Sequence, residues 1–312
     1  MIFSKNNCDT MKIAVTGGKG FIGNHLITQL LNEDYEVISL DKSANQGYLA
    51  DVEYLKCDIT NSNQVNSLTK DADVIIHLAA LSSIKDSTDN LVQYNRVNVE
   101  GTINVLEAAK KNSIEKVIFT STSVVYGKGN GLRQKEDSIL NPSNFYGLTK
   151  LSAEYYCSFY ADNFGLNTVS LRPFNVYGPM QKIDAGVIPV FINSALTQKK
   201  VPLYGSGKQK RDFIYVKDLV NCYIKAIKSS KKITGKSINV GSGENYSVLE
   251  ILKKIESISG KKVFVEKNNS IAGDVKDSLA DISLAKELLD WEPTYSLEQG
   301  LKETFEWYAS NK

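Results

Sequence analysis

Residues 11–41, "MKIAVTGGKGFIGNHLITQLLNEDYEVISLD", contain in order a strand pattern, a glycine-rich turn, a helix pattern and a second strand pattern. The run "KIAVT" is short and apolar, as in a parallel strand that is buried on both faces. The apolar residues of "FIGNHLITQLL" recur with the spacing of a helix that packs one face against a core. The turn between them carries four glycines, which are Gly17, Gly18, Gly20 and Gly23. This order predicts the first β–α–β unit of a parallel α/β sheet.

The glycines of this turn can be read both as G-x-x-G-x-x-G and as G-x-G-x-x-G. Glycine lets the backbone turn tightly and approach a pyrophosphate, and the helix that follows offers unpaired N–H groups and the positive end of its dipole. The second strand ends at Asp41, roughly 20 residues beyond the turn, where a carboxylate accepts hydrogen bonds from a ribose 2′-hydroxyl and repels a 2′-phosphate. Lys42 follows and weakens this preference without reversing it. The unit therefore predicts a dinucleotide site that takes NAD rather than NADP.

The alternation of strand and helix patterns continues along the front half of the chain. Such patterns occur at residues 52–60, 73–81, 90–112 and 115–127. Alternating strands and helices predict an α/β fold with a Rossmann-type doubly wound parallel sheet, whose ligands lie at the carboxyl ends of the strands. Asp58, at the end of its strand, is expected to lie near an adenine ring. His77 lies within a strand pattern and is interpreted as a packed core residue rather than a catalyst.

The composition is that of an ordinary globular chain. Of the 312 residues, 42% are hydrophobic, and the net charge of +2 with scattered lysines argues against a nucleic-acid binder. No apolar run approaches the roughly 18 residues of a membrane span. The four cysteines lack CxxC spacing and there are only two histidines, so we expect reduced thiols in the cytoplasm and no metal site. Residues 1–10 lack the apolar core of a signal peptide and are expected to be a disordered lead-in, or an over-long start before Met11.

A second informative stretch is residues 141–156, "NPSNFYGLTKLSAEYY". The letters "NPS" predict a helix entry, and the helix pattern then continues to a stop at Gly165. Tyr146 and Lys150 are four residues apart, so they share one face of this helix. A tyrosine that acts as a base near neutral pH needs its pKa lowered by roughly three units, about 4 kcal/mol, and a neighbouring cation can supply this. Taken alone, the spacing is more typical of a helix that packs one ring and exposes one amine.

Motifs along almost the whole chain, from Met11 to about Tyr308, resemble the extended short-chain dehydrogenase/reductases, in their nucleotide-sugar epimerase/dehydratase branch. They are "TGGKGFIG", "CDIT", "HLAA", "VNVEGT", "STSVVYG", "YGLTK", "LRPFNVYGP", "YGSGKQKRDFIYVKDL", "NVGSGENYSV" and "GDVKDSLADISLAKELLDWEP". Their number and order make the resemblance specific. It implies that Tyr146 is the acid/base acting on a sugar hydroxyl, that Lys150 holds the nicotinamide ribose and lowers the Tyr146 pKa, and that Thr122 hydrogen-bonds the reacting oxygen.

The resemblance also implies two sets of binding residues. Those expected to contact NAD are Gly17, Gly20, Phe21, Ile22, Gly23, Asp41, Lys42, Asp58, Ile59, Leu78, Ala79, Ala80, Asn98, Tyr146 and Lys150. Those expected to contact a nucleotide sugar, UDP-linked by resemblance, are Thr122, Ser123, Asn175, Val187, Tyr204, Arg211 and Ser278. The small Ser278 leaves room for an N-acetyl or uronic sugar, whereas Ile271 stands where the family usually has a pyrophosphate-binding arginine. Either Lys276 or another lysine replaces this arginine, or the substrate binds more weakly or differs from the family's. Two other roles are open: Ser278 fits an ordinary polar residue before a turn as well as a size gate, and Arg172 fits a substrate contact or a structural ion pair.

The residues after Thr122 distinguish among the reactions of this family. The dehydratases carry a glutamate there, and the same missing glutamate argues against the decarboxylating branch, because this chain has Ser123 and Val124 and a valine cannot move a proton. The expected reaction is 4-epimerisation, in which hydride leaves C4 and returns to the other face of a turned 4-keto sugar. The alternatives are a nucleotide-4-keto-sugar reductase, or another NAD(P)-dependent nucleotide-sugar enzyme such as a 3,5-epimerase-like relative, and, from a different class, a non-catalytic dinucleotide sensor.

The chain shows no break in composition, and we expect two interleaved domains. Residues 11–175, with a contribution from 212–240, are expected to form the NAD-binding domain. Residues 176–211 and 241–312 are expected to form the nucleotide-sugar-binding domain.

The resemblance further implies a homodimer through a four-helix bundle. The helices concerned are those at 90–112 and 146–163. Their outward faces carry aromatic residues that fit either a core or an interface, which are Tyr94, Tyr155, Tyr156 and Phe159.

Overall fold

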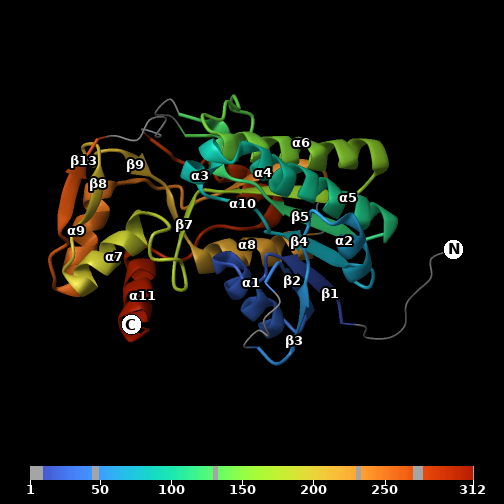
Figure 1. Cartoon of the computed structure of the whole chain (residues 1–312), viewed down its shortest axis with the longest axis horizontal. Helices are drawn as coiled ribbons and strands as arrows, with labels where there is room; N and C mark the ends of the chain where they lie inside the picture. Colours follow the sequence, from blue (N-terminus) through green and yellow to red (C-terminus); the bar gives the residue numbers. More distant parts are fainter. Residues whose placement is uncertain (1–9, 44–48, 129–132, 230–232, 270–276, 312) are drawn as a thin grey trace.

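The structure is a computed structural model that describes residues 10–43, 49–128, 133–229, 233–269 and 277–311 (Figure 1). Residues 1–9, Ile271 and Lys276 lie outside the described residues, so the expectations about the lead-in and about the replaced arginine stay predictions. Within the described ranges, no helix is long and apolar enough to cross a membrane. The same ranges contain no group of three or more His, Cys, Asp or Glu side chains that could hold a metal ion.

The main sheet has seven parallel strands in the order β11-β6-β5-β4-β1-β2-β3. They are β1 (Lys12–Thr16), β2 (Glu36–Asp41), β3 (Val52–Lys56), β4 (Val74–His77), β5 (Lys116–Thr120), β6 (Thr168–Pro173) and β11 (Lys236–Val240). The strand order changes direction at β1, which pairs with β2 on one side and with β4 on the other. A crevice for ligands forms at the carboxyl ends of the strands at such a point. The Rossmann-type doubly wound sheet expected from the sequence is confirmed.

Helices cover both faces of this sheet (Figure 1). One face carries α1 (Phe21–Asn32) and α8 (Val216–Lys228), and the other carries α2 (Ser62–Leu68), α5 (Gly101–Lys111) and α6 (Phe145–Phe164). Successive residues of β1 serve opposite faces, because Ile13 and Val15 pack on the α1 and α8 side while Ala14 packs on the α5 and α6 side. A strand buried on both faces needs apolar residues throughout, which explains the continuous apolar run in the sequence.

The back half forms small sheets and a separate helix layer, at the left of Figure 1. Its paired strands are β7 (Asn175–Tyr177) with β10 (Phe213–Tyr215), β9 (Lys210–Arg211) with β12 (Tyr246–Ser247), and β8 (Val201–Tyr204) with β13 (Val265–Asn268). Its helices are α7 (Val187–Thr197), α9 (Val248–Ser259) and α11 (Leu297–Ser310), whereas α10 (Ser283–Leu289) packs against β11 and α8 beside the main sheet. Of these, α7, α9 and α11 pack on one another. Although α8 and β11 follow β7 along the chain, they lie with the main sheet; the domain limits given above stay a prediction.

Two helices differ in detail from the expectation. The segment at 90–112 is not one regular helix, because α4 (Leu91–Asn95) is followed by a π-helical turn at Arg96–Glu100 and only then by α5. Such turns are frequent at functional sites. Helix α6 ends, as expected, at Gly165, whose φ of +67° is the left-handed conformation typical of a helix stop. Its N-terminal cap is Asn144 rather than a residue of "NPS", and the Asn144 side chain accepts a hydrogen bond from Gly147 N at 2.8 Å.

Candidate functional site

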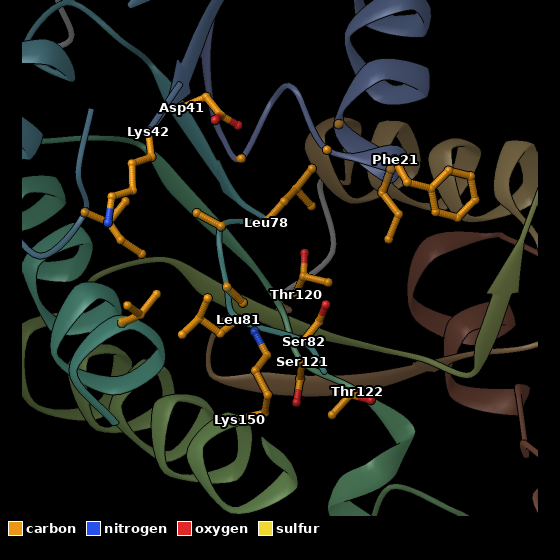
Figure 2. A pocket seen from close by; sticks show the side chains of 18 of the residues that line it. Phe21, Asp41, Lys42, Leu78, Leu81, Ser82, Thr120, Ser121, Thr122 and Lys150 are labelled. Carbon is orange, nitrogen blue, oxygen red and sulfur yellow. The ribbon is translucent and has the colours of Figure 1, made fainter. Parts of the chain in front are cut away.

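A cavity of about 510 Å³ lies at the carboxyl ends of β1, β2, β4 and β5. Its wall includes the residues expected to contact NAD other than Asn98, which are Gly17, Gly20, Phe21, Ile22, Gly23, Asp41, Lys42, Asp58, Ile59, Leu78, Ala79, Ala80, Tyr146 and Lys150. Figure 2 shows Asp41 and Lys42 at one end of this cavity and Thr122 and Lys150 at the opposite end. The fold therefore brings the glycine turn, the acidic strand end and the Tyr–Lys helix to one cavity of a size typical for ligands.

The glycine turn is packed too closely for side chains. Gly17 has a φ of +71°, and a Cβ there would lie 2.8 Å from Ala79 N. A Cβ on Gly23, in the first turn of α1, would lie 2.5 Å from Gly17 O. The N-cap residue of α1 is Gly20, and no side chain caps this helix. The N-terminal amides of α1 therefore remain available for the pyrophosphate of a dinucleotide.

The end of the cavity that lies away from Thr122 and Lys150 carries two carboxylates, those of Asp41 and Asp58. The Asp41 carboxylate accepts hydrogen bonds from Lys19 N at 3.3 Å and from the Ser43 hydroxyl at 2.9 Å. Lys42 directs its ammonium to Asp58, with an N–O distance of 3.4 Å, rather than toward a position beside Asp41. The positive charge of Lys42, which weakened the preference for NAD over NADP, is thus partly neutralised by Asp58. The residues present fit a cofactor with a free ribose 2′-hydroxyl.

The residues expected to be catalytic come from two neighbouring elements. Thr122 follows β5 and caps a short 3₁₀ turn, and its hydroxyl lies close enough to the phenol of Tyr146, at the start of α6, to lower the pKa of that phenol. Lys150 lies one helical turn further along α6, is buried, and holds its Nζ 4.2 Å from the centre of the Phe119 ring. All three residues of the expected set line the same cavity.

Burial shifts the pKa values of Tyr146 and Lys150. Burial raises the pKa of Tyr146 to about 12, opposed in part by the hydrogen bond from Thr122. Burial also lowers the pKa of Lys150 to about 7, because the ammonium loses its water. Burial thus favours the neutral form of both groups, and the expected lowering of the Tyr146 pKa by Lys150 stays a prediction.

Asn98 has a different position from the one expected. It lies buried in the π-helical turn and does not line the cavity among the described residues. Its Oδ1 accepts from Leu81 N at 2.8 Å, and its Nδ2 donates to Leu81 O at 2.9 Å and to Thr149 Oγ1 at 3.0 Å. The Asn98 amide thus fixes the segment after β4, which forms a wall of the cavity, and joins it to α6. In this structure Asn98 therefore positions that wall, and its expected contact with the cofactor stays a prediction.

Replacing Asn98 by alanine is expected to remove three hydrogen bonds and leave Leu81 N and O without their partner. Each net hydrogen bond contributes about 1 kcal/mol, so we expect a lower melting temperature without cofactor and weaker NAD binding. Thermal melts and NAD titration calorimetry measure both. The control is Asn163→Ala, which removes an exposed amide that donates to Phe159 O at 2.9 Å. A variant that loses NAD affinity at an unchanged melting temperature would instead support a direct cofactor contact.

A second cavity, of about 850 Å³, adjoins the first and shares Val176 with it. Four residues expected to contact a nucleotide sugar line it, which are Asn175, Val187, Tyr204 and Arg211. Ser123 and Ser278 are not among the described lining residues of either cavity, and Ser278 N instead donates to Lys210 O at 3.1 Å. The role of Ser278 as a size gate and the contact by Ser123 stay predictions.

Arg172 and His77 both have structural roles in the core. Arg172 is 3% exposed and pairs with Glu154, with its Nε 3.1 Å from Glu154 Oε2 and its Nη1 2.8 Å from the Tyr126 hydroxyl. It is therefore a buried ion pair rather than a substrate contact. His77 lies in β4 between the hydroxyls of Thr16 and Thr102, and burial lowers its pKa to about 3, which confirms a neutral core residue.

The sequence reasoning missed some of the residues that line the two cavities. Ser121, beside Thr122, is 2% exposed and its hydroxyl has no partner among the described residues; its place at the end of β5 was a signal that could have found it. Lys85 lines the second cavity from the front half of the chain. Nothing in its local sequence indicates this, because only the packing of the two halves brings the helix that carries it to that cavity.

Comparison of the chain with known proteins identifies the family to which it belongs. A model of the NAD dependent epimerase/dehydratase family matches residues 13–241. The chain is 36% identical to an uncharacterized UDP-glucose epimerase of Bacillus subtilis, over 96% of this chain and 98% of that protein. It is also 34% identical to a UDP-N-acetyl-alpha-D-glucosaminuronate decarboxylase of Bacillus cytotoxicus, over 94% of this chain and 96% of the relative.

Solved structures agree in fold over nearly the whole chain. One is a UDP-glucuronic acid 4-epimerase from Bacillus cereus in complex with UDP-glucuronic acid and NAD, with 36% identity, a TM-score of 0.90, and coverage of 97% of this chain and 100% of that one. Another is a UDP-glucose 4-epimerase from Thermotoga maritima with UDP-glucose, with 32% identity, a TM-score of 0.91, and coverage of 96% and 99%. With its glycine turn, its Tyr–Lys helix and these matches, the chain belongs to the NAD dependent epimerase/dehydratase family.

Proposed function

We propose that the chain is a nucleotide-sugar 4-epimerase that acts on a UDP-hexose or UDP-N-acetylhexosamine and uses NAD as its resident cofactor. The observation that carries the proposal is that Thr122, Tyr146 and Lys150 together line the first cavity, and that a second cavity adjoins it. Two adjoining cavities suit a dinucleotide and a nucleotide sugar whose reacting parts meet at Tyr146. Val124, beyond Ser123, offers no group for the proton transfer that elimination of water requires.

NAD would be held by the residues of the first cavity. The amides of the glycine turn and of α1 would bind its pyrophosphate, Asp41 the adenosine ribose and Lys150 the nicotinamide ribose. When bound, oxidised NAD supplies a hydride acceptor for the sugar C4 and a positive charge near the phenol. The residues present fit this cofactor, because the crowded positions at Gly17 and Gly23 leave backbone, and no side chain, facing a ligand.

The proton chemistry falls to Tyr146. As C4 is oxidised, the phenolate takes the proton of the O4 hydroxyl, and Thr122 hydrogen-bonds the same oxygen. Because burial alone raises the Tyr146 pKa to about 12, ionisation of the phenol requires nearby positive charge. The protonated form of Lys150, one turn away on α6, is one source of it. On hydride return to the opposite face of the 4-keto sugar, Tyr146 gives the proton back to O4, so the reaction needs no net oxidant.

The test is to incubate the protein and NAD separately with UDP-glucose, UDP-N-acetylglucosamine and UDP-glucuronic acid, and to follow the sugar H1 and H4 signals by proton NMR. We expect each accepted sugar to give an equilibrium mixture of C4 epimers, without net change in the absorbance of reduced nicotinamide. Stoichiometric consumption of NADH or NADPH with a 4-keto sugar would point to a reductase. Release of carbon dioxide from the uronic acid would point to a decarboxylase, and failure with every sugar and nucleotide would leave only a binding protein.

We also propose that two chains pair through the outer face of α4 and α6. This face exposes large apolar side chains, including Val92, Leu148, Tyr155 and Phe159, the last two with 59% and 52% of their surface in solvent. Tyr94, expected to share this face, is instead buried and donates its hydroxyl to Ser83 O. Sedimentation equilibrium is expected to give twice the chain mass, and a charge at the centre of the patch, Phe159→Glu, is expected to give single chains. A wild-type protein that sediments as a single chain contradicts the proposal.

The expected cytoplasmic location stays a prediction.

A further inference from the structure

The short helix α3 (Ile84–Asp89) lies where the two cavities meet. Leu81 and Ser82, just before it, line the first cavity, whereas Lys85, in its first turn, lines the second. The segment is firmly held, because the hydroxyl of the buried Tyr94 donates to Ser83 O at 2.7 Å and the Ser83 hydroxyl caps the helix by accepting from Asp86 N. Lys85 therefore projects from a fixed support.

Lys85 is an exposed cation on the wall of the second cavity, on a short helix that also carries Asp86 and Asp89. The charged side chains that line the second cavity are Lys85, Asp184 and Arg211, among the residues that the structure describes. Arg211 belongs to β9 of the back half, and Lys85 is the one contribution of the front half to this wall within the described ranges. No described residue forms an ion pair or a side-chain hydrogen bond with the Lys85 ammonium. A partnerless cation on the wall of a ligand cavity is suited to an anionic group of the ligand.

The position of Lys85 indicates which anionic group of the ligand its ammonium would contact. If the substrate is a nucleotide sugar, its reacting carbon must reach Tyr146 and Thr122, which line the first cavity, so its nucleotide occupies the second. The diphosphate joins these two parts and therefore passes the junction at which α3 lies. We propose that Lys85 is a substrate-binding residue whose ammonium contacts the diphosphate, so that both halves of the chain, through Lys85 and Arg211, hold it. The inference rests on the proposed function only in taking the ligand to be a nucleoside-diphosphate sugar.

Binding measured apart from turnover tests this inference. Calorimetric titration with UDP and with uridine compares the wild type, Lys85→Met, Lys85→Arg and, as a matched loss of one positive charge, Lys200→Met, an exposed lysine outside both cavities. We expect Lys85→Met to weaken UDP binding about tenfold, to flatten its dependence on salt, and to leave uridine binding unchanged. Lys85→Arg and Lys200→Met are expected to bind UDP like the wild type. Turnover of UDP-glucose should show the same rise in KM with little change in kcat.

Each other result counts against the inference. Unchanged UDP affinity in Lys85→Met overturns it, and an equal loss of UDP and uridine affinity shows a structural role instead. A loss seen only with UDP-glucuronic acid, and not with UDP or UDP-glucose, moves the contact to the sugar carboxylate and overturns the diphosphate assignment. Failure of the proposed function has a different signature, since a wild type that binds UDP but converts no UDP-sugar defeats the epimerase proposal while the Lys85 comparison stands.

Discussion

Tyr146→Phe is expected to abolish sugar interconversion while NAD binding persists. The substitution removes one hydroxyl from the pair formed by Thr122 and Tyr146 and leaves the ring and the backbone of α6 in place. General acid–base catalysis by a positioned side chain contributes roughly 10²- to 10⁴-fold to a rate. The Tyr146 phenol lines the cavity together with Thr122, and it is the group proposed to exchange a proton with the sugar. The rate of epimer formation by NMR should therefore fall by at least that factor.

The controls separate catalysis from folding. Because phenylalanine retains the packing of the ring, the melting temperature and the NAD affinity of Tyr146→Phe should stay close to those of the wild type. Tyr155→Phe, which removes a hydroxyl from an exposed ring of the same helix, is expected to keep full activity. If Tyr146→Phe kept more than about a tenth of the wild-type rate, far above the expected range, the assignment of the acid/base would be wrong.

Glu154→Gln is expected to lower the free energy of unfolding by about 3–5 kcal/mol, since removal of one partner leaves the buried Arg172 guanidinium without a counter-charge. Both side chains are almost fully buried, at 3% and 4% exposure. The Glu154 carboxylate also accepts a hydrogen bond from Ser237 of β11 at 2.8 Å. The pair thus ties α6, one turn beyond Lys150, to the neighbouring strands β6 and β11. Urea unfolding should show a lower midpoint at an unchanged m-value.

An exposed ion pair provides the matched control. Asp290 is 90% exposed and lies 3.5 Å from Lys225 Nζ, so Asp290→Asn should cost less than about 1 kcal/mol. A double replacement, Glu154→Leu with Arg172→Met, leaves no buried charge and is expected to recover part of the lost stability. A cost for Glu154→Gln no larger than that for Asp290→Asn would mean that the buried pair contributes no more than a surface pair.

Local patterns explain why much of the fold could be predicted. The glycine turn, its distance to Asp41 and the stop at Gly165 depend on backbone conformations that neighbouring residues dictate, and the strands are recognisable because burial on both faces requires continuous apolar runs. The same holds for Tyr146 and Lys150, whose spacing alone places them on one helix face. The structure agrees with each of these expectations.

What the sequence by itself determined is therefore the doubly wound sheet and many, but not all, of the residues that line the first cavity. Tertiary structure alone decided that Tyr94 is buried, that Asn98 binds Leu81 rather than facing the cavity, and that Arg172 pairs with Glu154. It also raised the pKa of Tyr146 and lowered that of Lys150, because desolvation depends on the whole surrounding packing. The reason is the same in each case: a partner distant in the chain, or the exclusion of water by several elements together, leaves no trace in the spacing of neighbouring residues.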